Sequence, residues 1–360
     1  MNDIAVIGGG LLGRCLAWRA SRAGARVALY DAAGIHGDSA AAWVAAGMIA
    51  PIAESAVCDP QIESQIESMG RRSLSIWPKW LSELPAPVFY RESGTIMVWH
   101  REDAGEAVRV ERAPASRYSQ SWIQLTERSH IAELEPALSA RFSEALYIPG
   151  EAQVDNREFL IAVAGALEAG GVACHWWTRV ENGALPPAGT IVDCRGFGAK
   201  SSWPKLRGVR GEIVRLHAPE IELQHMVRLL HPRCPVYIVP RAGGRLVVGA
   251  TSIESDDLSP VSVRGALELL SSAYSVLPAL AEARILEFGT QVRPALPDNL
   301  PALRWDRRRN ILSVNGLYRH GFLLTPAVVE KVLSLVSIQE KSTLFGSSGV
   351  QEEVEACLSL

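Results

Sequence analysis

The first thirty residues change their hydrophobic period twice. Residues 4–7 and 27–30 are short apolar runs, IAVI and VALY. Between these runs, apolar side chains recur at helical spacing, including Leu12 and Leu16, and the segment ends at Gly24. The pattern predicts a buried strand, an amphipathic helix and a second strand, which is the order of a βαβ unit.

The rest of the chain switches between the two periods. Helical spacing predicts helices over residues 61–84 and 261–277, a helix that ends at Gly170 and a last helix that begins near Pro326. Alternation predicts strands in VFYRESGTIMVWH, and GTIVDCRGFGA is predicted as a buried strand that runs into glycines. Further strands, with turns between them, are predicted in VRGEIVRLHAP, CPVYIVPRAGGRLVVGATSIES, ARILEFGTQVRPALPD and RNILSVNG. Strands of the βαβ kind thus occur at the start, middle and end of the chain, with antiparallel-looking segments between them. This order predicts two interleaved domains.

Three glycines follow the first apolar run in the pattern GxGxxG, at Gly8, Gly10 and Gly13. In such turns the first glycine permits the bend, the second lets a pyrophosphate approach the backbone, and the third lets the helix pack closely. The helix N-terminus adds unpaired N–H groups and a partial positive charge. Asp31 follows the second strand, where it is placed to accept hydrogen bonds from a ribose, and it argues against NADP.

These features predict a dinucleotide site. The turn alone does not separate FAD from NAD, and a βαβ unit whose glycines serve only packing is the structural alternative.

The composition is that of an ordinary globular protein. The 360 residues are 48% hydrophobic and 21% charged, and the net charge of −3 offers no basic surface for nucleic acid. No apolar run has the length of a membrane span and no signal-peptide pattern precedes the first strand, so we expect a cytoplasmic protein. The six cysteines and eight histidines lack the paired spacing of a metal site, so no metal is expected.

Several further motifs occur together in one order: AAGMIAP, ESGTIMV, EAQVDNREFL, VRGE, VYIVPR followed by VVGATSIE, QVRPALPDNLP and GLYRHGFLLTP. With the glycine pattern, they resemble the D-amino-acid oxidase family of flavoproteins from about residue 3 to 336, and within it the glycine oxidases of thiamin biosynthesis. The resemblance implies FAD and oxidation of glycine, sarcosine or a small D-amino acid. It also implies reoxidation by molecular oxygen, which gives hydrogen peroxide, and a homo-oligomer.

Covalent attachment of the flavin, as in monomeric sarcosine oxidase, needs a cysteine near the isoalloxazine in the C-terminal part. No cysteine lies between Cys234 and Cys357, so noncovalent FAD is expected.

The resemblance also implies residue roles. Arg293 matches the arginine that holds the substrate carboxylate, a task that suits the planar, permanently charged guanidinium. Tyr237 matches a tyrosine at the substrate, Ser252 matches a residue bordering the substrate pocket, and Arg319 matches an arginine beside the flavin and substrate. The expected cofactor contacts are Gly8, Gly10, Leu11, Leu12, Gly13, Asp31, Ala45, Ala46, Gly47, Met48, Gly196, Gly316, Tyr318, Arg319, His320, Gly321 and Phe322.

Some positions depart from the family motifs. Leu317 and His320 stand where the family has a histidine and an asparagine, Arg195 lies in a strand end that is usually ATG or ASG, and Lys200 replaces a small residue. The differences at Leu317, His320 and Arg195 bear on flavin contacts, whereas the long side chain of Lys200 is expected to be harmless. His320 is either a general base or a structural histidine.

The expected fold class is α/β (α+β), with a Rossmann-like FAD-binding domain interleaved with a substrate domain on a mixed, largely antiparallel sheet. The predicted boundaries are 1–84, 151–215 and 285–337 for the FAD-binding domain, 85–150 and 216–284 for the substrate domain, and 338–360 for a polar, partly disordered tail.

The leading hypothesis is an FAD-dependent amine oxidase that transfers a hydride from a small substrate to the flavin. A dehydrogenase of the same fold that passes electrons to a carrier stays open. The oxidase half of a tRNA-wobble modification enzyme shares the fold but requires RNA contact and a fused methyltransferase. A noncatalytic dinucleotide-binding protein is a remote third reading, and the presence of Arg293 argues against it.

Overall fold

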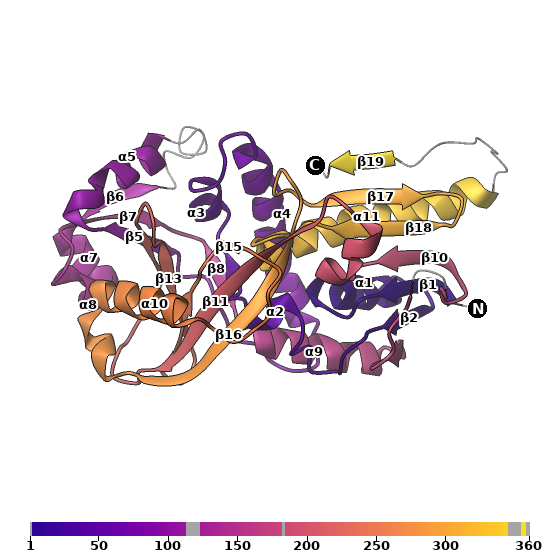
Figure 1. The fold of residues 1–360 in the computed structure, drawn as a ribbon, viewed down its shortest axis with the longest axis horizontal. Coiled ribbons are helices and arrows are strands. Elements are labelled where there is room, and N and C mark those ends of the chain that lie inside the picture. Colours follow the sequence, from indigo (N-terminus) through magenta and orange to yellow (C-terminus); the bar gives the residue numbers. More distant parts are fainter. Residues whose placement is uncertain (1, 113–122, 182–183, 345–353, 358–360) are drawn as a thin grey trace.

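The computed structural model describes residues 2–112, 123–181, 184–344 and 354–357, which build two large sheets and one small sheet (Figure 1). The seven-stranded sheet has the order β19-β17-β18-β10-β1-β2-β9. Its strands are β1 (Asn2–Ile7), β2 (Val27–Tyr30), β9 (Ala173–His175), β10 (Ala188–Asp193), β17 (Ala302–Asp306), β18 (Ile311–Asn315) and β19 (Val354–Cys357). The strands from β18 to β9 pair in parallel, and β17 pairs antiparallel with both neighbours. Segments from the start, middle and end of the chain therefore share one sheet.

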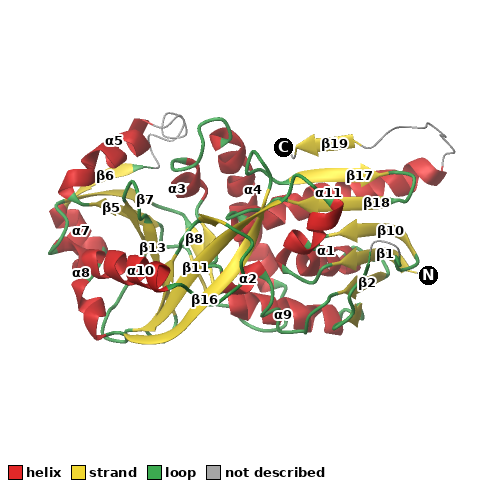
Figure 2. Ribbon diagram, viewed as in Figure 1, coloured by secondary structure: helices red, strands yellow, loops and turns green. Residues whose placement is uncertain are grey.

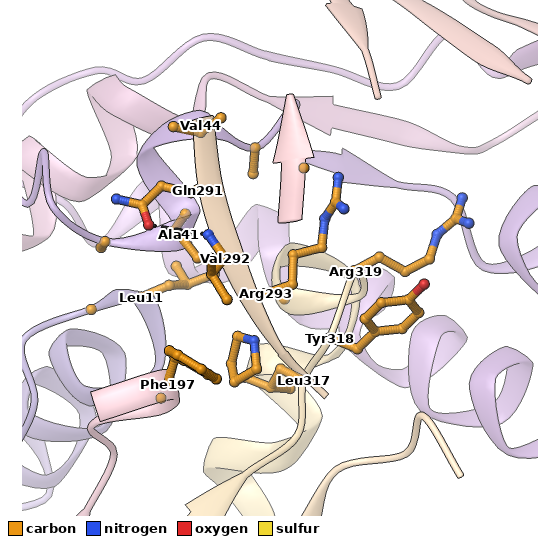
Figure 3. A pocket seen from close by; sticks show the side chains of 18 of the residues that line it. Leu11, Ala41, Val44, Phe197, Gln291, Val292, Arg293, Leu317, Tyr318 and Arg319 are labelled. Atoms are coloured by element: carbon orange, nitrogen blue, oxygen red, sulfur yellow. Dashed lines mark hydrogen bonds between the residues drawn. The ribbon is translucent and has the colours of Figure 1, made fainter. Parts of the chain in front are cut away.

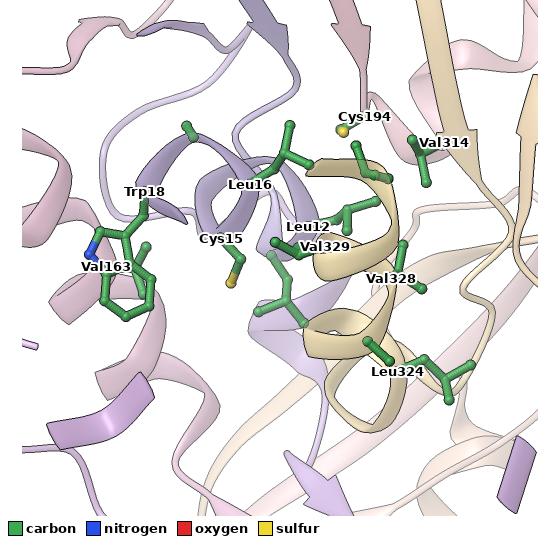
Figure 4. Close-up of a cluster of buried hydrophobic side chains, with 14 of the residues drawn as sticks. Leu12, Cys15, Leu16, Trp18, Val163, Cys194, Val314, Leu324, Val328 and Val329 are labelled. Atoms are coloured by element: carbon green, nitrogen blue, oxygen red, sulfur yellow. The ribbon is translucent and has the colours of Figure 1, made fainter. Parts of the chain in front are cut away.

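Four helices of the described chain accompany this sheet. They are α1 (Leu11–Arg22), α4 (Glu63–Ser82), α9 (Asn156–Ala169) and α11 (Gly321–Leu344). Two of them, α1 and α9, contact its strands directly. Helix α1 contacts α9 and α11, and α11 contacts α4. Figure 4 shows Leu12 and Leu16 of α1 beside Val328 and Val329 of α11, all of them buried. The apolar spacing along α1 is thus explained by burial between neighbouring helices and the sheet.

The nine-stranded sheet has the order β15-β11-β14-β13-β12-β5-β7-β6, and β16 also pairs with β11. Its strands are β5 (Thr95–Trp99), β6 (Gln124–Glu127), β7 (Glu144–Ile148), β11 (Arg207–His217), β12 (Met226–Leu230), β13 (Val236–Arg241), β14 (Arg245–Gly249), β15 (Ile253–Glu254) and β16 (Arg284–Ala295). The β12–β5 pair is parallel, and the other strand ladders are antiparallel. The mixed, largely antiparallel second sheet agrees with the expected fold class.

Shorter elements complete the fold (Figure 2). They are α5 (Ala104–Arg112), α7 (Arg128–Leu134), α8 (Pro136–Ser139), α10 (Val263–Val276) and the 3₁₀ helices η1 (Arg101–Asp103), η2 (Gly196–Ser202) and η3 (Pro278–Glu282). The small sheet β3-β8-β4, made of Met48–Ile49, Ala152–Val154 and Tyr90–Arg91, is accompanied by α2 (Ala41–Val44) and α3 (Pro51–Ser55). The two strands expected in VFYRESGTIMVWH are β4 and β5, which lie in different sheets.

The domain boundaries stay a prediction. Strands β11 and β16 fall largely within segments predicted for the FAD-binding domain, and both belong to the nine-stranded sheet. Within the described part of the chain, no helix is both long enough and apolar enough to cross a bilayer.

The last helix begins at Gly321, earlier than the expected start near Pro326, so that prediction is wrong. A proline inside a helix leaves the carbonyl four residues earlier without its N–H partner. Here that carbonyl belongs to Phe322, and the indole N–H of Trp77 donates to it at 3.1 Å. A side chain from α4 thus satisfies the carbonyl and allows the helix to run through the proline.

Two parts of the predicted C-terminal tail have regular secondary structure. Helix α11 continues to Leu344, and β19 pairs with β17, a strand that the sequence pattern did not predict. The remainder of the expected tail, residues 345–353 and 358–360, lies outside the described residues.

Candidate functional site

One large cavity is bordered by strands of both large sheets and collects most of the expected site residues (Figure 3). Its volume of about 1020 Å³ is at the upper end of the range for small-molecule and cofactor sites. The lining includes every expected cofactor and substrate residue except Gly13 and His320. In Figure 3, Arg293 and Arg319 extend in the same direction, and Tyr318 lies beside Arg319.

The glycine turn between β1 and α1 has the geometry of a phosphate cradle. Gly8 has a φ of +101°, and a Cβ there would lie 2.6 Å from the carbonyl oxygen of Cys194. A Cβ on Gly13 would lie 1.8 Å from the carbonyl oxygen of Gly8. Gly10 differs, because its nearest neighbour would be the Cβ of Ala40 at 3.9 Å, and no side chain caps the N-terminus of α1 beside it. An uncapped helix N-terminus next to open space fits the diphosphate of a dinucleotide.

Asp31 borders the cavity directly after β2. Its carboxylate accepts the N–H of Gly9 and, at 2.6 Å, the N–H of Ala33, one on each oxygen. The side chain therefore holds the glycine turn against the loop that follows β2. Its expected contact with a ribose stays a prediction.

Arg14 was not identified from the sequence, although it supports the same turn. Its fully buried guanidinium donates to the carbonyl oxygens of Gly9 at 2.5 Å, Ile35 at 2.7 Å, Leu160 at 3.1 Å and Gly34 at 3.4 Å. Burial lowers the pKa of this guanidinium. The available signal was a charged residue among the apolar residues that directly follow the glycine turn.

The segment from Ala45 to Met48 forms another wall of the cavity. Gly47 has a φ of +63°, and a Cβ there would lie 2.1 Å from the carbonyl oxygen of Val154. The buried Arg241 donates to the carbonyl oxygen of Ala46 and, at 2.6 Å, to the side chain of Gln153. Burial lowers the pKa of Arg241 to about 10. This segment is therefore fixed from two sides.

Arg293 projects from β16 into the cavity. Its Nη1 donates to the carbonyl oxygen of Thr251 at 3.1 Å, and within the described ranges no carboxylate pairs with it. A Cβ on Gly211 of the neighbouring β11 would lie 2.2 Å from Nη2, so the glycine leaves room for the guanidinium. Arg293 is thus a cation with open hydrogen-bonding capacity.

Tyr237 of β13 also lines the cavity, and burial raises the pKa of its hydroxyl. A Cβ on Gly249 would lie 2.5 Å from this hydroxyl oxygen, so the neighbouring strand leaves space for the ring. Ser252 lies farther along, with its hydroxyl oxygen 3.4 Å from that of Tyr318. Tyr318 has a φ of +49°, in the left-handed region, within the loop between β18 and α11.

A cluster of charges lies at the same end of the cavity. Glu54 of α3 has one carboxylate oxygen 2.9 Å from Nη1 of Arg228 and the other 3.1 Å from Nε of Arg319. Burial raises the pKa of Glu54, but the charges of Arg228 and Arg319 and the contact with His320 outweigh it and hold the pKa well below its ordinary value. Glu54 therefore carries a charge at neutral pH.

His320 takes part in this cluster and does not line the cavity. It is 2% exposed, and its Nδ1 lies 3.4 Å from the Glu54 carboxylate. Burial lowers its pKa, although Glu54 opposes the shift. Glu54 and Arg228 were both missed from the sequence. The signal for Arg228 was a charge inside the apolar strand MVRLL, whereas Glu54 lies among small residues that gave none.

The chain matches known proteins over nearly its whole length. The family model described as "FAD dependent oxidoreductase" (DAO) matches residues 3–333. A protein of Rhizobium etli named "Putative thiamine biosynthesis oxidoreductase ThiO" is 42% identical over 333 residues, which is 91% of this chain and 94% of that protein.

Two further relatives carry related names. The crystal structure of glycine oxidase from Geobacillus kaustophilus superposes with a TM-score of 0.82 at 27% identity and covers 93% of this chain and 94% of that one. The "Bifunctional protein ThiO/ThiG" of Nostoc is 28% identical over 95% of this chain, which corresponds to 53% of that protein. The chain therefore belongs to the DAO family of FAD-dependent oxidoreductases and is an FAD-using enzyme of the glycine oxidase and ThiO type.

Proposed function

We propose that this enzyme oxidises glycine, or a similarly small amine or amino acid such as sarcosine or a small D-amino acid, to an imine. The observation that carries the proposal is Arg293, a cavity-lining guanidinium without a carboxylate partner in the described structure. It shares its cavity with the glycine turn that fits the diphosphate of FAD. A planar guanidinium binds a carboxylate through two hydrogen bonds, which fixes the orientation as well as the position of the substrate.

Bound FAD supplies the oxidant for the Cα–H bond of the substrate. The residues of this chain would hold the cofactor at Gly8–Leu12, Ala45–Met48 and Gly316–Phe322. Arg293 would bind the substrate carboxylate, and the neighbouring Tyr237 hydroxyl, whose pKa is raised by burial, would stay protonated and donate a hydrogen bond. Orientation is the main contribution of such a site, because correct placement of two reactants lowers the barrier without acid–base chemistry.

We further propose that molecular oxygen reoxidises the flavin and gives hydrogen peroxide, and that the product serves thiamin biosynthesis. The names of the Rhizobium and Nostoc relatives support the role in thiamin biosynthesis. Noncovalent FAD and a homo-oligomer belong to the same proposal. Release of the flavin on denaturation and the mass in solution test these two points.

A cytoplasmic location is also part of the proposal. Five cysteines of the described chain are free thiols, namely Cys15, Cys58, Cys174, Cys194 and Cys234. Free thiols suit a reducing compartment.

The test is anaerobic mixing of the purified protein with glycine, sarcosine and D-alanine in separate experiments. We expect flavin absorbance to disappear with at least one of them and to return in air with one equivalent of hydrogen peroxide. Bleaching without recovery in air would identify a dehydrogenase that uses another electron acceptor. A flavin that none of the three substrates reduces would contradict the proposed substrate class.

A further inference from the structure

Four charged side chains meet at the substrate end of the cavity. Arg228, Arg293 and Arg319 supply three positive charges, and Glu54 supplies one negative charge. All four line the same cavity, although they come from β12, β16, the loop before α11 and α3. The positive charges therefore exceed the negative ones before any substrate enters.

The Glu54 carboxylate pairs with two of the three arginines. Glu54 lies 2.9 Å from Arg228 through Oε1 and 3.1 Å from Arg319 through Oε2, and Nη2 of Arg319 also donates to Oε1 at 3.4 Å. Arg293 instead donates to the carbonyl oxygen of Thr251 at 3.1 Å. Arg228 and Arg319 thus already have an anionic partner, and Arg293 has none in the described chain.

The backbone fixes Glu54 in this position. It belongs to the short helix α3, whose N–H groups at Ile52 and Ala53 donate to the buried carboxylate of Glu151 at 2.8 and 2.9 Å. The Glu54 side chain is itself buried, with 6% of its surface exposed. Rotation away from Arg228 would leave a guanidinium whose side chain is 7% exposed without its counter-ion, which is costly in a buried site.

We propose that Glu54 is a specificity-determining residue, a resident carboxylate that occupies the place on Arg228 and Arg319 where a second acidic group of a substrate would bind. The proposal rests on the proposed function, because it takes Arg293 as the site of the first substrate carboxylate. With Glu54 in place, the cavity binds one carboxylate and disfavours amino diacids through like-charge repulsion. Removing the charge of Glu54 opens a second carboxylate site.

Titration calorimetry of the FAD-loaded enzyme at pH 7 with acetate and with malonate tests this inference. The two probes differ by one carboxylate. We expect the wild type to favour acetate, and Glu54→Gln to raise the ratio of malonate to acetate affinity by about tenfold or more, the usual worth of a hydrogen bond to a charged group. A role confined to structural support would weaken both probes alike and leave the ratio unchanged.

Glu106→Gln is the matched control. Glu106 also lines the cavity and pairs with an arginine, Arg109, at 3.0 Å, but that arginine is half exposed to solvent. The same chemical change there should alter the ratio by less than about threefold, because exposed ion pairs contribute little.

A Glu54→Gln ratio within about threefold of the wild type would overturn the inference while leaving the proposed function intact. Failure of the wild type to bind either probe would remove the Arg293 site, and with it both proposals. If Glu54→Gln does not fold, the double variant Glu54→Gln/Arg228→Met replaces it. This variant removes the guanidinium of Arg228, which would otherwise be buried without a counter-ion, and it still leaves Arg319 free to bind the second carboxylate. The same tenfold criterion then applies.

Discussion

Replacing Arg14 by methionine should reveal how much of the FAD site depends on a residue outside the cavity. The guanidinium joins the glycine turn, at Gly9, to the loop after β2, at Gly34 and Ile35, and to α9, at Leu160. Methionine keeps the apolar stem of the side chain and removes all of these donors. The loop from residue 32 to 40 supplies several cavity-lining residues, so the change should reach the proposed FAD site through the backbone.

The size of the effect follows from the number of bonds and the cost of burying the charge. Four hydrogen bonds to carbonyls are lost, and each is worth about 1 kcal/mol net, or somewhat more with a charged donor. Burying the charge of Arg14 has a desolvation cost, and this cost lowers the pKa of Arg14 in the native enzyme. Methionine carries no charge, so the variant does not have this cost and part of the lost stability is offset. We expect the free energy of unfolding to fall by about 3 kcal/mol. The Kd for FAD should rise about tenfold or more, which corresponds to about 1.4 kcal/mol.

Urea denaturation of the apoprotein and fluorescence titration with FAD measure the two quantities separately. Arg19→Met is the control, because Arg19 lies on the same helix but is partly exposed and pairs with Glu83. That change should cost about 1 kcal/mol or less and leave FAD affinity unaltered. Equal effects of the two substitutions on stability and on FAD affinity would refute the reasoning.

Three other substitutions test separate parts of the site. Arg293→Lys should raise KM for glycine about tenfold or more without changing the flavin spectrum, because lysine lacks the planar guanidinium that binds both carboxylate oxygens. An unchanged KM in steady-state assays would exclude Arg293 as the carboxylate anchor. Gly13→Ala should yield protein without FAD, because the added Cβ would lie 1.8 Å from the carbonyl oxygen of Gly8. The ratio of absorbance at about 450 nm to that at 280 nm measures the flavin content, and a wild-type ratio after purification would contradict this prediction. Burial raises the pKa of Glu151 from 4.5 to about 7. Between these two pH values the folded protein keeps the proton of Glu151 and the unfolded chain has lost it, so the contribution of Glu151 to stability falls as pH rises through this interval. Glu151→Gln should therefore gain Tm relative to the wild type between pH 5 and 7.5, and parallel Tm profiles would show that Glu151 does not titrate there.

The parts of the fold that could be predicted from sequence are those set by local pattern. The change from an apolar run to helical spacing, with glycines at 8, 10 and 13, locates β1 and α1 because each signal arises within a few residues. The start of α11 was misplaced for a nonlocal reason. Pro326 normally marks a helix boundary, and a distant indole, that of Trp77, satisfies the carbonyl that this proline leaves free.

The same contrast holds within the candidate site. Arg293 and Tyr237 lie in motifs whose order along the chain suggested their role, and both line the cavity. Glu54 and Arg228 gained their significance only when folding brought α3 against β12, since neither residue belongs to a recognisable motif. Arg228 stood out locally as a charge inside an apolar strand, but the local pattern around it does not reveal its partner Glu54, which lies in a distant segment.

The most direct test of the account is a crystal structure of the enzyme with FAD and acetate. We predict that the diphosphate lies at the N-terminus of α1, and that acetate lies between the flavin and Tyr237 with both oxygens on Arg293. Acetate bound instead to Arg228 or Arg319, or a flavin outside this cavity, would contradict the account.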